Sequence, residues 1–90
     1  MNALLITYEL KGNKDYTGLY DVLKSAPGWW HYLDSTWIIK TEETTEVWAD
    51  KLKPHIDEVA DSMLVIEVKK SANHNGWLPK KAWNWIGENI

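Results

Sequence analysis

The first apolar stretch of the chain alternates as a half-buried β-strand does. In residues 3–10, ALLITYEL, large side chains fall at every second position: Leu4, Ile6, Tyr8 and Leu10. A period of two with β-branched and aromatic residues predicts a strand, and this one is mostly apolar on both sides. The turn-forming residues 11–14, KGNK, predict its end.

The pattern then changes to a helical one. Asp15 is a residue type that caps helices, and the apolar positions after it recur at helical spacing: Tyr16, Leu19, Tyr20 and Leu23. The Pro27-Gly28 pair predicts the end of this helix.

The next stretch, GWWHYLDSTW at residues 28–37, holds three tryptophans, a tyrosine and a histidine. Residues 29–33 and 36–41 read as two short strands with a tight reversal at Asp34-Ser35. Because the reversal lacks an Asn-Gly or Asp-Gly pair, a single bent strand is an alternative. Strand alternation puts Trp30 and Tyr32 on one face and their neighbours on the other.

The second half repeats the order of helix and strand. A helix is expected from Thr44 or Thr45, shortened or kinked by Pro54, with this apolar face: Trp48, Leu52, Ile56 and Val59. Residues 63–68, MLVIEV, predict a strand, and residues 69–76 a loop. Pro79 suits the first position of a terminal helix that uses Ala82, Trp83, Ile86 and Ile90, with Trp85 pointing away.

This order of elements predicts an α+β protein of the ferredoxin-like type, βαββαβ, with an antiparallel sheet and two helices on one face. Residues 1–70 would form that domain. Residues 71–90 would form a C-terminal helical tail that packs on the sheet or on a dimer partner.

Length and composition narrow the function. A chain of 90 residues buries only roughly 60–65% of its unfolded surface, which favours a homodimer. The absence of cysteine excludes disulfide, zinc-thiolate and thiol chemistry, and is compatible with a reducing compartment. The opening MNALLITYEL is not typical of a signal peptide or a membrane span, so we expect a cytoplasmic protein with no membrane partner.

The charge balance argues against nucleic acid as a partner. All ten basic residues are lysines and the net charge is −3, whereas phosphate recognition favours arginine and a positive surface. A local basic face is still conceivable around Lys69, Lys70, Lys80 and Lys81.

Few residues are candidates for chemistry. Glu9 closes the first strand and could be a metal ligand, a general base or a solvated carboxylate. His31, His55 and His74 lack metal-ligand spacing, and Asp34-Ser35 beside His31 lacks a nucleophile elbow.

The tryptophans are candidates for binding. They could stack bases, but the acidic flanks favour a core or interface role. The predicted binding or dimer-interface residues are Trp29, Trp30, His31, Trp37, Trp77 and Trp83.

Several segments together resemble the SinR-like family of short bacterial and phage proteins: Thr7-Tyr8-Glu9-Leu10, WWHYLDSTW at 29–37, Lys53-Pro54-His55 and Leu64-Val65-Ile66. That family is in turn similar to the ferredoxin-like nucleases of CRISPR adaptation modules and to VapD toxins. The resemblance implies a ferredoxin-like homodimer. In those nucleases an aspartate at the end of the first strand binds a divalent metal, and Glu9 stands at the matching position here.

The predicted function is therefore a small dimeric protein-interaction module of mobile-element, phage or defence context, without catalysis or cofactor. The alternative is a metal-dependent endonuclease of the CRISPR-associated or VapD type that uses Glu9 and a divalent metal. We further expect residues 71–90 to pack across the dimer, over the open face of their own sheet at the interface or onto that of the partner, burying Trp29 or Trp30 with Trp37 nearby.

Overall fold

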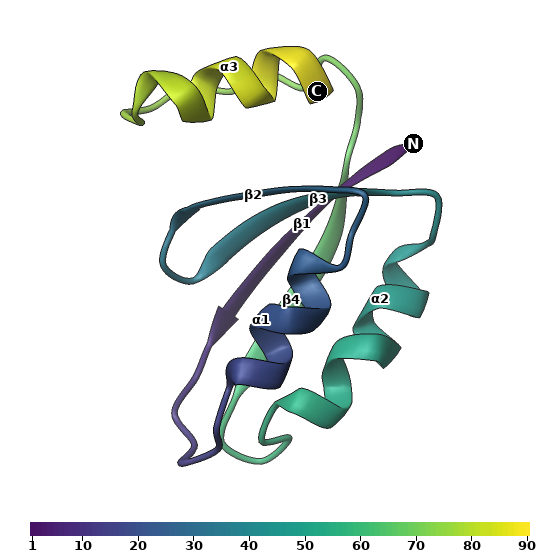
Figure 1. Cartoon of the computed structure of the whole chain (residues 1–90), viewed down its shortest axis with the longest axis vertical. Helices are drawn as coiled ribbons and strands as arrows, with labels where there is room; N and C mark the ends of the chain where they lie inside the picture. Colours follow the sequence, from purple (N-terminus) through teal and green to yellow (C-terminus); the bar gives the residue numbers. More distant parts are fainter.

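The computed structural model describes residues 1–90 as a four-stranded antiparallel sheet with three α-helices (Figure 1). The strands are β1 (Asn2–Glu9), β2 (Gly28–Leu33), β3 (Thr36–Thr41) and β4 (Ser62–Val68), and their spatial order is β2-β3-β1-β4. The helices are α1 (Thr17–Lys24), α2 (Thr45–Leu52) and α3 (Lys80–Asn89), with a short 3₁₀ turn, η1 (Lys53–His55), after α2.

Helices α1 and α2 cover one face of the sheet and enclose the larger core. Alternate residues of β1 and β3 point into it, as the period of two predicts. The buried members of this core are Leu4, Ile6, Tyr8, Leu19, Leu23, Ala26, Trp37, Ile39, Trp48 and Leu52. Nothing else in the chain buries as much apolar surface together, so this core supplies most of the fold's hydrophobic stabilisation.

Helix α3 lies across the opposite face of the same sheet, as Figure 1 shows above the β2–β3 hairpin. A second cluster forms there from Ala3, Trp30, Ile38, Ala82 and Ile86. Strand β1 therefore contributes to both cores, with Leu4 and Ile6 toward α1 and α2, and Ala3 toward α3.

Most predicted element positions agree with the structure. The two strands of the aromatic stretch and their reversal at Asp34-Ser35 are present, and the alternative of a single bent strand is wrong. Thr44 caps α2, because its side-chain oxygen accepts a hydrogen bond of 3.2 Å from the Val47 amide. Helix α1 begins at Thr17, and the Asp15 side chain binds the Thr17 amide and hydroxyl just before it.

Two predicted positions are wrong. Val59 does not continue the apolar face of α2, because the helix ends at Leu52 before Pro54 and Val59 is fully exposed in the following turn. Trp85 does not point away from the terminal helix's packing face. It packs against the α3 cluster and its ring lies 4.0 Å from where a side chain at Gly28 would begin.

None of the helices is both long enough and apolar enough to cross a membrane.

Candidate functional site

Trp37 of β3 is the centre of an aromatic group to which β2 and α1 also contribute. Its indole is 1% exposed, and the His31 ring stacks on it with 3.8 Å between ring centres. Tyr20 of α1 stacks at 6.4 Å and Trp29 of β2 packs at 5.4 Å with tilted planes. Because Trp37 is enclosed on all these sides, it stabilises the core and offers no free ring for a ligand to stack on.

Hydrogen bonds fix the same group at its buried end. The Trp37 indole N–H donates to the Tyr8 hydroxyl at 3.0 Å, and that hydroxyl donates to the Asp34 carbonyl at 3.3 Å. Burial raises the pKa of Tyr8, although the bond from Trp37 acts in the opposite direction. The phenol therefore stays protonated and serves as a structural donor and acceptor.

His31 has no catalytic partner. Its Nε2 lies 3.1 Å from the backbone carbonyl of Asp34, so the histidine meets the main chain of that residue. A serine-triad arrangement would instead need the carboxylate on the histidine and a nucleophile beside it. The contact orients the imidazole over Trp37 and closes the β2–β3 turn.

Trp30 faces the other side of the sheet. It is 3% exposed, and its indole N–H donates a hydrogen bond of 3.2 Å to the Ala82 carbonyl of α3. Tyr32 packs beside it at 5.4 Å. The α3 helix thus covers Trp30 in its own chain. The prediction that Trp37 lies near Trp30 on this face is wrong, because Trp37 points into the α1–α2 core on the other face.

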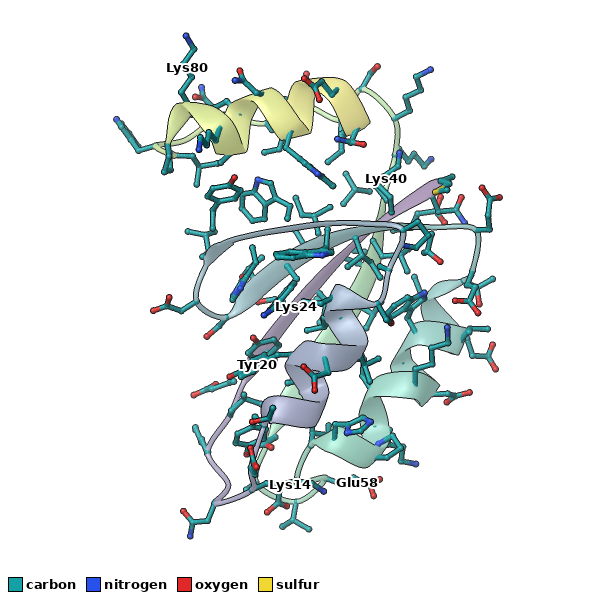
Figure 2. The ribbon with its side chains drawn as sticks, viewed as in Figure 1. Lys14, Tyr20, Lys24, Lys40, Glu58 and Lys80 are labelled. Carbon is teal, nitrogen blue, oxygen red and sulfur yellow. The ribbon has the colours of Figure 1, made fainter.

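Trp77 lies in the segment before α3, and Trp83 lies in the first turn of that helix. Trp83 is half-buried and stacks with His74 at 5.8 Å, while Trp77 is 97% exposed. Figure 2 shows Lys80 pointing away from the sheet. The alternation of lysine and tryptophan in this segment therefore separates charge and apolar surface onto different sides of the helix.

Glu9 lies at the exposed end of β1. Its carboxylate forms an ion pair of 3.2 Å with Lys11, and about two thirds of each side chain is exposed. A shallow hollow of about 360 Å³ lies beside it, lined by residues of β1 and β4. No group of three or more histidine, aspartate or glutamate side chains in the chain is placed to hold a metal ion.

Asp61 is the most heavily bonded polar side chain, and the sequence reading missed it. Its carboxylate accepts hydrogen bonds from the amides of Lys11, Gly12 and Asp57 and from the Tyr16 hydroxyl, at 2.6–3.0 Å. These bonds join the β1–α1 loop to the α2–β4 loop. The signal available in the sequence was only an aspartate directly before a strand.

The hydrogen bond between Asp61 and Tyr16 contributes to pKa shifts of both side chains. Burial opposes ionisation of Asp61, but the hydrogen bonds from Tyr16, Asp57, Gly12 and Lys11 outweigh it and lower its pKa to about 2. Burial and the adjacent carboxylate raise the pKa of Tyr16 to about 12. Both carboxylate oxygens of Asp61 accept two hydrogen bonds from within the chain, so Asp61 has a structural role.

The part of the sheet that α3 leaves uncovered lies on β1 and β4. Leu5 pairs directly with Ile66, and Thr7 with Leu64, so these four side chains share the face on which α3 sits. Leu64 is 55% exposed and Ile66 51% exposed. These two residues form an apolar strip along an outer strand, which we call the β4 strip.

A groove runs along the same strand on the other face. It has a volume of about 390 Å³ and is lined by residues of α2, of the turn after it and of β4. Ala49, Ile56, Met63 and Val65 give it apolar walls, while Glu46 and Asp50 stand on the α2 side.

Comparison with known protein families, curated proteins and solved structures finds no match to this chain.

Proposed function

We propose that this protein is a small non-catalytic interaction module that associates with itself through apolar surface on its sheet. The observation that carries this proposal is the β4 strip, where two large aliphatic side chains are more than half exposed on an outer strand. Apolar surface of this kind on a sheet is normally covered by a partner.

The proposed fold is ferredoxin-like. The order of elements, βαββαβ, the strand order β2-β3-β1-β4 and the two helices on one face support it. The SinR-like resemblance supports the finer proposal that the module belongs to a mobile-element, phage or defence context and acts on a protein partner in the cytoplasm.

The alternative, a divalent-metal-dependent endonuclease, has less support. Glu9 is the carboxylate that such a site would use, but Lys11 neutralises it and no second ligand stands beside it in the chain. Magnesium needs several oxygen ligands in near-octahedral geometry, so a site on Glu9 would have to draw the rest from a second copy and from substrate.

Sedimentation velocity of the purified protein over a wide concentration range tests the proposal. We expect a reversible monomer–dimer equilibrium, with the weight-average sedimentation coefficient rising with concentration. A chain that sediments as a monomer throughout the micromolar range would contradict self-association and leave the β4 strip without its proposed role.

A further inference from the structure

The two outer strands of the sheet differ in whether they can accept another strand. In β2 the register shifts between Trp30 and Leu33, so that His31 and Tyr32 together lie opposite Trp37 alone. A bulge of this kind twists an edge and prevents regular pairing along it. The β2 edge is therefore protected.

The β4 edge has no such protection. Its seven residues pair with β1 in one unbroken register from Ser62 to Val68, without proline and with Glu67 as the one charged side chain. Its outer backbone N–H and C=O groups consequently form a regular row with no strand beside them. Three residues of this strand, Met63, Leu64 and Val65, also line the α2–β4 groove.

Two large aliphatic side chains, Leu64 and Ile66, flank Val65 at the middle of β4. If two copies of the strand pair antiparallel about a twofold axis at Val65, all seven residues pair, and Leu64 of each copy lies opposite Ile66 of the other. Moving the axis by one residue, to Leu64, would instead leave Glu67 and Val68 without partners in the strand of the second copy.

We infer that β4 is the surface through which this protein binds a second copy of itself, with the axis at Val65 and the two sheets joined into one. This inference rests on the proposed self-association and gives it a location and a register. The β4 strips of both copies become one apolar cluster across the axis, with Leu64 beside Ile66 twice.

Pairing of β4 with β4 of a second copy gives an assembly of defined size, because it leaves no regular strand edge exposed. Once the two β4 strands pair, the outer strands of the joined sheet are the two bulged β2 strands. No regular edge remains for a third copy, so growth stops at the dimer.

Sedimentation of the unmodified protein and of two double variants tests both the β4 interface and its register. In the double variant Leu64→Lys, Ile66→Lys, every introduced lysine faces a lysine of the second copy, and we expect the dimer dissociation constant to rise by about a hundredfold or more. In the double variant Leu64→Lys, Ile66→Glu, every lysine faces a glutamate. We expect this variant to dimerise much more tightly than the double lysine one, although it carries the same number of charges at the same positions.

The matched control is the double variant Val59→Lys, Trp77→Lys, which places two lysines at exposed apolar positions away from β4. It should dimerise as the unmodified protein does. Circular dichroism of all variants checks that each is folded, since both β4 positions are already half exposed and tolerate lysine.

The outcomes distinguish the β4 interface from the proposed self-association on which it rests. A monomeric unmodified protein contradicts self-association itself. If the unmodified protein dimerises and the double lysine variant dimerises equally well, β4 is not the interface. If both charged variants dissociate to the same extent, the register about Val65 is wrong.

Discussion

Replacing Trp30 by alanine should weaken the protein strongly, because this indole is the main contact between the sheet and α3. Trp30 is 3% exposed and packs with Ile38, Ala82 and Ile86. Truncating a buried tryptophan to alanine costs about 3–5 kcal/mol, and the lost hydrogen bond to the Ala82 carbonyl is part of that loss. A domain of this size has a net stability of roughly 5–13 kcal/mol, so the change removes a substantial share of it.

Urea unfolding followed by circular dichroism measures the effect. We expect the Trp30→Ala midpoint to fall by an amount that corresponds to several kcal/mol, and the denaturant slope to fall too if α3 detaches before the rest unfolds. Trp30→Phe, which keeps an aromatic ring but loses the N–H donor, should cost less. The control is Trp77→Ala, a 97% exposed tryptophan of the same tail, which should change stability by no more than about 0.5 kcal/mol. A Trp30→Ala protein as stable as the Trp77→Ala control would refute the packing of α3 on this face.

Three further predictions concern charge and chemistry. The pKa of Asp61 is lowered to about 2 from its ordinary 3.8, so its contribution to stability is present above about pH 4 and is lost as the pH falls toward 2. The Asp61→Asn variant should be less stable than the unmodified protein at neutral pH, and its stability should fall less on acidification. Urea unfolding midpoints measured as a function of pH will show both effects. Incubation with RNA or DNA and magnesium or manganese should give no cleavage above background, and turnover that disappears in Glu9→Ala would promote the nuclease alternative. Binding to generic DNA or RNA should be no tighter than about 10⁻⁴ M at physiological salt, and micromolar affinity with a steep salt slope in a titration would count against this.

Local patterns in the sequence were enough to predict most of the elements. The period of two in residues 3–10, the Thr44 cap and the break at Pro54 are each local signals, and each one agrees with the structure. The prediction for Val59 was wrong because it extended the apolar spacing of α2 beyond Pro54, where the helix has already ended. The local break at Pro54 overrode the periodicity there.

The faces of the aromatic residues depended on long-range packing. Alternation correctly separated Trp30 from Trp29, but nothing local indicated that Trp37 would enter the α1–α2 core while Trp30 met α3. Asp61 was missed for the same reason. Three of its donors come from residues some 45–50 positions earlier in the chain, and no spacing rule connects them.

The position of α3 has a consequence for the order in which the molecule opens. This helix follows the long connection from Lys69 to Pro79 and packs on the sheet through the smaller of the two cores, whereas β1 is bonded on both sides within the sheet. Such an outer unit opens at lower free energy than the centre. Among the helices and strands, amide hydrogen exchange should therefore be fastest in α3 and slowest in β1. Each opening of α3 transiently exposes Trp30 and the apolar side chains around it to solvent.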